Sequence, residues 1–156
     1  MPRLEQLPEK QRATLRAQAV PSYDTSPQAS LSVGLDQSQV ALVTTAGLHL
    51  RGDRPFERQD PGFRVIPGAV EPNELLQSHA SIGFDRTAMQ RDINVVFPVD
   101  RLREFEREGV VGSLGPRFLS FMGAQADPEH VLSAAVGEAL ELLRADGTDV
   151  VLLTPT

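Results

Sequence analysis

His49 is the first residue of this sequence whose type and position suit chemistry. It closes the run Thr44-Thr45-Ala46-Gly47-Leu48-His49, which overlaps the end of an apolar segment, residues 39–45, that predicts a strand. Small residues after a strand let a ligand approach the backbone, and an imidazole there can bind an anion or transfer a proton near neutral pH. A tight turn that carries a surface histidine would give the same pattern, so both interpretations stay open.

His79 is a second candidate for proton transfer. It follows Ser78 and precedes Asp85 and Asp92 in the sequence. Either carboxylate could orient the imidazole ring as the partner in an acid–base pair. Alternatively, the two aspartates cap turns and His79 bonds to a backbone carbonyl. A metal site built from His49, His79 and an aspartate lacks the spacing of a known ligand motif, so we expect no metal.

Arginine and glutamate alternate along a predicted helix at residues 98–108, whose apolar stripe includes Leu102 and Phe105. Such alternation is typical of a solvated helix face with ion pairs. Arg101 is the exception that we consider. It lies in the first turn, close to the end of a strand predicted over Ile93–Phe97. At that place its guanidinium could bind an anionic group.

The order of the predicted elements indicates the fold class. Apolar runs rich in β-branched residues predict strands, and amphipathic runs with capping residues predict helices. We expect further strands at 63–66, 118–123 and 149–154, helical turns at 71–77, and a helix from Asp127 to Asp146 with Leu140 on its apolar face. Strands and helices that alternate in this way predict an α/β domain with an open, mainly parallel, doubly wound sheet and flavodoxin-like packing.

The chain divides into two parts of different composition. Residues 3–18 predict a short amphipathic helix in which Pro8 lies in the first turn or breaks the helix. An irregular linker follows at residues 20–38, which hold Pro21, Pro27, Gly34 and several serine, aspartate and glutamine residues. We therefore expect an N-terminal helix and linker over residues 1–38 and the α/β domain over residues 39–156.

The run Val150–Leu153 predicts a buried strand near the end of the sequence. Apolar residues on both faces suit an interior strand of a parallel sheet. In open α/β sheets the reactive groups lie just beyond the carboxyl ends of such strands. Thr154, Pro155 and Thr156 occupy that position, so we expect them to line the site and the domain to be incomplete at its C-terminus.

Composition excludes several classes of function. The net charge of −6 argues against nucleic-acid binding, which needs a basic surface. No apolar run approaches the roughly 20 residues that span a membrane, and the start lacks an apolar signal core, so we expect a cytoplasmic protein. The sequence contains no cysteine, which excludes disulfides, thiolate metal sites and thiol catalysis within it.

Six motifs in a fixed order carry a family resemblance. They are Val40–His49 (VALVTTAGLH), Phe63–Gly68 (FRVIPG), Ser78-His79, Asp92-Ile93-Asn94, Phe97–Glu104 (FPVDRLRE) and Phe121-Met122-Gly123. Together they resemble the selenoprotein B family of glycine, sarcosine, betaine and D-proline reductases, most strongly its D-proline reductase branch. The resemblance covers residues 39–156, and the motifs are specific as a set although each is weak alone.

The resemblance implies a selenocysteine-dependent reductase subunit that cleaves a carbon–nitrogen bond of an amino acid or betaine-like substrate, with a dithiol as electron donor. In that family the strand equivalent to Val150–Thr154 is followed by selenocysteine or cysteine. A pyruvoyl group on a partner subunit holds the substrate. We therefore expect the nucleophile immediately after Thr156, no catalytic nucleophile and no cofactor within this chain, and truncation at a UGA codon. A naturally short paralogue is the alternative.

The resemblance also indicates site residues. The positions that match the family's motifs are His49, His79, Asp92, Asn94, Asp100 and Arg101. We expect the two histidines to position substrate or transfer protons, and Arg101 to bind an anionic group. The D-proline branch has two glycines and Tyr-Asp after the Ser-His pair, whereas this chain has Ala80–Asp85 (ASIGFD), which favours a related branch. A non-catalytic module that docks on a partner subunit and a small hydrolase built on the two histidines are the alternatives.

Overall fold

The computed structural model describes residues 3–17, 22, 24–26, 29–79 and 86–155. The chain forms two compact units, Met1–Ser30 and Leu31–Thr156. Within the described part of the chain, no helix is both long enough and apolar enough to cross a membrane.

The first unit contains a short helix whose start is set by a proline. A 3₁₀ turn, η1 (Leu4–Gln6), precedes Pro8, and helix α1 spans Glu9–Ala17. The carbonyl oxygen of Pro8 accepts a hydrogen bond from the Arg12 amide (3.0 Å). Proline suits the start of a helix and disrupts its interior. Of the two roles expected for Pro8, the second is therefore the correct one, because Pro8 separates α1 from η1.

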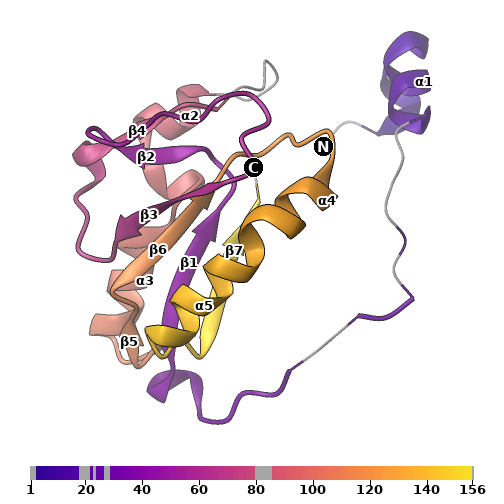
Figure 1. Ribbon diagram of the computed structural model, residues 1–156. Helices are drawn as coiled ribbons and strands as arrows, with labels where there is room; N and C mark the ends of the chain where they lie inside the picture. The colour runs from indigo at the N-terminus through magenta and orange to yellow at the C-terminus, as the bar shows by residue number, and fades with distance from the viewer. Residues whose placement is uncertain (1–2, 18–21, 23, 27–28, 80–85, 156) are drawn as a thin grey trace. The chain divides into compact units, whose positions relative to one another are not determined.

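A five-stranded sheet forms the centre of the second unit (Figure 1). Its strands are β1 (Gln39–Thr44), β3 (Phe63–Pro67), β5 (Ser113–Leu114), β6 (Arg117–Phe121) and β7 (Val150–Thr154). β1 pairs in parallel with β5, β6 and β7, and β3 runs antiparallel to β6. β6 and β7 flank β1, because both pair with its last two residues. The predicted α/β class is confirmed with a mixed sheet, and flavodoxin-like packing stays a prediction.

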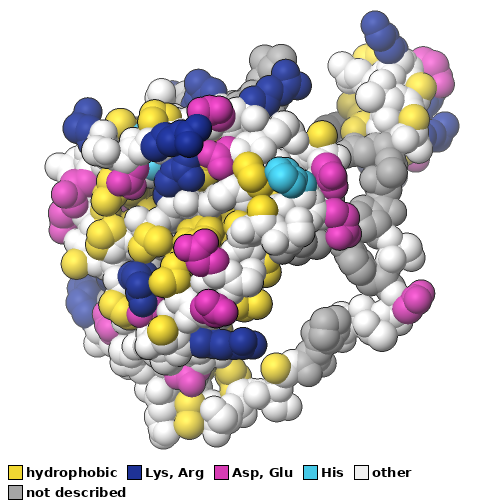
Figure 2. Space-filling view, in the orientation of Figure 1, with side chains coloured by type: hydrophobic (Ala, Val, Ile, Leu, Met, Phe, Trp, Pro, Cys, Tyr) yellow, Lys and Arg dark blue, Asp and Glu magenta, His cyan; other side chains and the backbone are white. Residues whose placement is uncertain are grey.

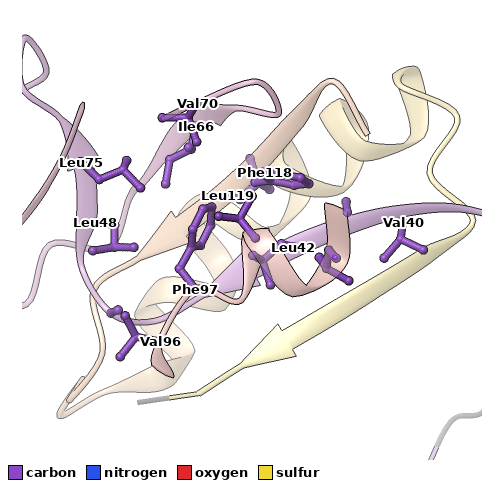
Figure 3. Close-up of a cluster of buried hydrophobic side chains, with 14 of the residues drawn as sticks. Val40, Leu42, Leu48, Ile66, Val70, Leu75, Val96, Phe97, Phe118 and Leu119 are labelled. Carbon is purple, nitrogen blue, oxygen red and sulfur yellow. The ribbon is translucent and has the colours of Figure 1, made fainter. Parts of the chain in front are cut away.

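Helices cover both faces of this sheet (Figures 1 and 3). They are α3 (Val99–Arg107) on one face, and on the other α4 (Pro128–Val131), the π-helical turn η5 (Leu132–Val136) and α5 (Gly137–Ala145). Arg117 and Phe118 on β6 establish the two faces, because adjacent strand residues point to opposite sides. Phe118 packs edge-to-face on Phe97 beside α3 (ring centroids 5.8 Å apart), whereas Arg117 binds Asp146 at the end of α5.

Two short strands lie outside the main sheet. They are β2 (Leu48–Leu50) and β4 (Leu75–Gln77), which pair antiparallel. The remaining elements of this unit are η2 (Leu35–Gln37), η3 (Pro72–Glu74), η4 (Ile93–Val95) and α2 (Arg86–Arg91). The pairing of β2 with β4 places the residue after β4, Ser78, within reach of a side chain on β2.

The hydrophobic core lies between the sheet and its helices (Figure 3). Val40, Leu42, Phe97, Phe118 and Leu119 are each at most 3% exposed. Burying one side chain of this size contributes about 1.5–3 kcal/mol of transfer free energy. The buried core therefore holds the ends of the parallel strands in fixed positions.

The surface is polar by contrast. On the face of the molecule that Figure 2 shows, basic and acidic side chains are interspersed on the surface.

One predicted element is wrong in type, and a second is only partly correct. Ile93–Phe97, predicted as a strand, begins with the 3₁₀ turn η4, because the Asp92 carboxylate accepts the Asn94 amide and tightens the chain there. The one or two helical turns expected within 71–77 are confirmed in part: η3 forms one 3₁₀ turn, and Leu75–Gln77 forms strand β4 instead.

Three predicted burial patterns are also wrong. Phe105 on α3 is 43% exposed and Leu140 on α5 is 45% exposed. In β7, Val151, Leu152 and Leu153 are 37%, 38% and 67% exposed. β7 pairs with β1 alone among the strands that the structure describes, so it is an edge strand and not the interior strand that its sequence predicts.

Candidate functional site

Two threonines bind one carbonyl oxygen where β1 and β7 end. The Thr44 hydroxyl donates to the Val96 carbonyl oxygen (2.8 Å), and the Thr154 hydroxyl lies 3.1 Å from the same atom. The carbonyl oxygen of Thr154 in turn lies 3.3 Å from the Thr45 amide nitrogen. Parallel strands that end at one edge are where α/β domains bind ligands. The threonines therefore fix the carboxyl ends of β1 and β7 to the segment that follows η4.

Gly47 makes the tight turn that follows β1. Its φ is +65°, in the left-handed region that glycine favours. Its amide donates to the Phe121 carbonyl at the end of β6, and its carbonyl accepts from the Ser78 amide, both at 2.9 Å. A Cβ atom at Gly47 would lie only 3.3 Å from the His79 backbone nitrogen. The turn thus brings the Ser-His pair against the ends of β1 and β6.

His49 is a buried residue of β2 with both ring nitrogens in hydrogen bonds. It is 3% exposed. Its Nδ1 lies 2.8 Å from the Leu50 carbonyl oxygen, and its Nε2 lies 2.8 Å from the Ser78 hydroxyl. Because a carbonyl oxygen only accepts, Nδ1 carries a proton, and in the neutral ring Nε2 accepts the Ser78 hydroxyl hydrogen. His49 can therefore orient the Ser78 hydroxyl.

His79 is also buried, at 2% exposed. Burial lowers the pKa of its imidazole below the ordinary value, and the nearby positive charge of Arg86 lowers that pKa further. The Arg86 guanidinium also donates to the His79 carbonyl oxygen (2.6 Å). The imidazole is therefore held neutral, which is the form in which a general base acts, and the lowered pKa makes it a weaker base than a free histidine.

Asp92, Asn94 and Asp100 form one network that joins η4 to α3. The Asp92 carboxylate accepts from the Asn94 amide nitrogen Nδ2 (2.8 Å), which also donates to Asp100 Oδ2 (3.0 Å). Asn94 Oδ1 accepts from the Asp100 backbone amide (3.0 Å), at the first turn of α3. Hydrogen bonds from Asn94 lower the pKa of the Asp92 carboxyl. The network holds the η4 turn, and Val96 directly after that turn supplies the carbonyl that binds Thr44 and Thr154.

Arg101 lies on the outer side of α3, where it is exposed. Its guanidinium forms an ion pair with Glu104 (2.9 Å), and both side chains are in contact with solvent. Its positive charge lies near enough to lower the pKa of Asp92. The neighbouring Arg103 instead points inward and donates to the carbonyl oxygens of Gly68 and Val70. Binding of an anion by Arg101 would compete with Glu104.

The structure brings some of the predicted residues together and separates others. His49, Ser78 and His79 surround the Gly47 turn, and Thr154 lies at the ends of the same parallel strands. Pro155 is exposed next to Thr154. Among the described residues, Asp92, Asn94 and Asp100 are linked to this region through η4, which precedes the Val96 carbonyl. Thr156 and the segment Ala80–Asp85, with Asp85 as a candidate partner of His79, lie outside the described residues.

Two contacts at this site were not predicted. The Thr44 hydroxyl and the Arg86 guanidinium both bind backbone carbonyls here. A threonine pair at a strand end is a weak signal for the first, and an isolated arginine gives no signal for the second. Among the described residues, no group of three or more His, Cys, Asp or Glu side chains could hold a metal ion.

Comparison with known families identifies the chain. Residues 16–156 match the family model for glycine/sarcosine/betaine reductase selenoprotein B. This chain belongs to the selenoprotein B family. The resemblance predicted from its motifs is therefore confirmed.

Several curated proteins are similar to this selenoprotein B chain. D-proline reductase subunit gamma of Acetoanaerobium sticklandii is 38% identical over 121 residues, 77% of this chain and 49% of that protein. Sarcosine reductase complex component B subunit beta of Peptoclostridium acidaminophilum is 28% identical over 143 residues, 88% of this chain and 32% of that protein. Glycine reductase complex component B subunit gamma of Carboxydothermus hydrogenoformans is 29% identical over 142 residues, again 88% and 32%.

The selenoprotein B chain therefore spans between about a third and a half of the length of these relatives. Their names describe subunits and components of reductase complexes. No solved structure matches the chain. Two findings bear on function: the chain belongs to this family, and its polar residues meet at the ends of the parallel strands.

Proposed function

We propose that this chain is the N-terminal portion of a selenocysteine-dependent reductase subunit that cleaves a carbon–nitrogen bond of an amino acid or betaine-like substrate. The observation that carries the proposal is that, in a selenoprotein B chain, the Thr154 carbonyl at the end of β7 and the Ser78 amide both hydrogen-bond to residues 45–47, the segment that follows β1. A nucleophile that follows Thr154 closely in sequence would lie at the edge where α/β domains carry their reactive groups.

The reaction needs two electrons and two protons. The carbon–nitrogen bond breaks, and a carbon–hydrogen and a nitrogen–hydrogen bond form. We propose a dithiol as the source of both electrons and both protons, so that it becomes a disulfide. The nucleophile would be a selenolate or thiolate, because such a group is ionised and reactive near neutral pH. This sequence contains no cysteine, so the nucleophile would come from outside its 156 residues.

Within the chain, His79 and Ser78 are the groups best suited to act on a substrate. His79 has a pKa lowered by burial, so a neutral imidazole that accepts a proton is available. The Ser78 hydroxyl is oriented by His49 and can hydrogen-bond a substrate heteroatom. Arg101 would hold an anionic group such as a carboxylate in place of Glu104.

We propose that the partner is a pyruvoyl-containing reductase subunit. Such a group would supply a carbonyl that withdraws electrons from an amine-containing substrate. Family membership supports a role beside such a partner, because the relatives are named as subunits and components of reductase complexes. The contribution of this chain would be to bind and orient the small substrate and to hold or transfer protons at His79.

The nucleotide sequence after the codon for Thr156 tests the proposal directly. We expect an in-frame UGA, followed within about four codons by a cysteine codon and a longer reading frame. Protein expressed with selenium and this continuation should catalyse dithiol-dependent turnover of D-proline, glycine, sarcosine or betaine in the presence of the partner subunit. The 156-residue chain should give none. A genuine terminator with no coding continuation, or clear turnover by the 156-residue chain, would refute the proposal.

A second candidate is a non-catalytic module that docks on a partner subunit. The exposed apolar strand β7 favours it, since such an edge needs a partner in solution. The same nucleotide sequence separates the two candidates. A natural terminator leaves docking as the function, whereas a continuing frame with selenocysteine or cysteine supports the reductase.

A further inference from the structure

The strand β7 exposes apolar side chains on both of its faces. Residues in register on paired strands share a face, so Leu152 lies on the face of Leu42 and Leu153 on the face of Val43. Leu42 is fully buried, whereas Leu152 is 38% and Leu153 67% exposed. Apolar residues on both faces are typical of strands inside a parallel sheet, with a neighbour on each side. β7 thus has the composition of an interior strand in an edge position.

The opposite edge of the same sheet is protected. β3 carries Arg64 and ends at Pro67, both of which discourage the pairing of a further strand. The Arg64 guanidinium also binds Asp60 (2.7 Å) and the carbonyl oxygen of Pro55 (3.2 Å), which holds the preceding loop against this strand. The described residues of β7 include no charge and no proline. The two edges of one sheet are therefore built for different surroundings.

We infer that β7 is the docking edge for a further strand, supplied by the part of the reductase polypeptide that corresponds to the unmatched half of D-proline reductase subunit gamma. This identification of the occupant rests on the proposed function, whereas the docking edge itself does not. This chain matches 49% of that relative. The unmatched part of such a protein is therefore the segment that we expect to pack beside this sheet. The added strand would run parallel to β7, as the neighbours of β1 do.

Exposed apolar side chains on two other elements of this unit offer further surface on which the added segment would pack. Leu140 on α5 is 45% exposed and Val95 on η4 is 59% exposed. In Figure 1, α5 runs beside β7, and Val95 directly precedes Val96, whose carbonyl oxygen binds the Thr154 hydroxyl at the end of β7. A strand with flanking helices would cover both, because parallel strands are connected by helices that lie on the faces of the sheet. A lone strand would leave these two side chains exposed.

Fragment binding tests this inference without an activity assay. The probe is the part of the Acetoanaerobium sticklandii subunit gamma that lies outside its match to this chain, expressed separately and mixed with the 156-residue protein. We expect a complex on gel filtration and at least tenfold slower hydrogen exchange of the β7 amides. Leu153→Lys should weaken binding at least tenfold. Because Leu153 is 67% exposed, this variant should fold normally, as circular dichroism would verify.

A matched control is Val110→Lys, in the turn after α3, where the replaced side chain is also exposed (44%). It should change binding less than twofold. Absence of a complex, or a complex that leaves exchange of the β7 amides unchanged, would overturn the inference.

Two other results would identify a different occupant of the β7 edge. A homodimer that Leu153→Lys dissociates would identify a second copy of the chain as the occupant. Slow exchange of β7 in the free chain that is lost on deletion of residues 1–30 would identify the chain's own N-terminal unit. Either result would overturn the inference while leaving the proposed function untouched.

Discussion

Thr44 and Thr154 are 110 residues apart in the sequence, yet their hydroxyl groups lie 2.8 Å and 3.1 Å from the same carbonyl oxygen, that of Val96. Thr44 ends β1 and Thr154 ends β7, and the two are paired in register. A single backbone atom after η4 therefore fixes the relative position of two strand ends. These hydrogen bonds would therefore determine the position of any residue that directly follows β7.

Thr154→Val should destabilise the protein by about 1 kcal/mol, because it removes hydroxyl hydrogen bonds and keeps the shape of the side chain. Thr154→Ser retains the hydroxyl and should lose less. Thr44→Val should cost more, about 1–3 kcal/mol, since Thr44 is fully buried and its Oγ1 also accepts from the Ala46 amide. Urea unfolding at constant m value measures these differences. Equal stability of Thr154→Val and the natural protein would show that the Val96 contact contributes nothing.

Asn94→Ala should raise the pKa of the Asp92 carboxyl toward its ordinary value. Asn94 donates to that carboxylate from both its side chain and its backbone amide, and the side chain makes the larger contribution to the low pKa. The backbone donor remains in the variant, so the pKa should rise only in part. A carbon-detected NMR titration of the aspartate carboxyl groups would follow it. An unchanged Asp92 pKa would mean that the Asn94 side chain does not bind Asp92 in solution.

The sequence alone predicts much of the central sheet. β1, β6 and α3 were predicted within two residues of their ends, because each combines a strong local pattern with a clear terminator. Ile93–Phe97 was predicted wrongly since its β-branched residues favour a strand, whereas the carboxylate of Asp92 closes a 3₁₀ turn. For β7 the apolar run identifies a strand, but no pattern within a strand reveals whether a neighbour lies on each side.

The site was predictable only in part. Residue type alone indicates His49 and His79, and the structure places the His79 backbone against the Gly47 turn and His49 on the Ser78 hydroxyl. The bond between His49 and Ser78 joins residues 29 positions apart and depends on the register of β2 with β4, which the sequence does not specify. The sharing of the Val96 carbonyl by two threonines likewise arises only from tertiary structure.

His79 should make the protein less stable in mild acid. Its pKa in the folded state is lowered below the ordinary value of 6.5 by burial and by Arg86. Below pH 6.5 the unfolded chain therefore binds a proton that the folded chain does not, so the free energy of unfolding should fall as the pH decreases from 6.5 toward the folded-state pKa. The slope is at most about 1.4 kcal/mol per pH unit.

His79→Gln stays neutral at every pH and is the comparison for this effect. Urea unfolding of both proteins between about pH 7 and pH 5, above the range in which carboxyl groups titrate, should show a smaller slope for the variant. His49 and His130 are present in both proteins, so the difference in slope isolates His79. Parallel pH profiles would show that the pKa of His79 is not lowered by folding.

Gly47→Ala should destabilise the protein more than Gly109→Ala does. Both glycines have a positive φ, +65° and +70°, so each substitution carries a conformational cost of about 1–2 kcal/mol. A Cβ atom at Gly109 meets nothing within 4 Å, whereas one at Gly47 lies 3.3 Å from the His79 backbone nitrogen. The difference between the two unfolding free energies therefore measures the contact between the β1 turn and the Ser-His segment. Equal losses would show that this segment moves away freely, and His79 would then have no fixed position beside the strand ends.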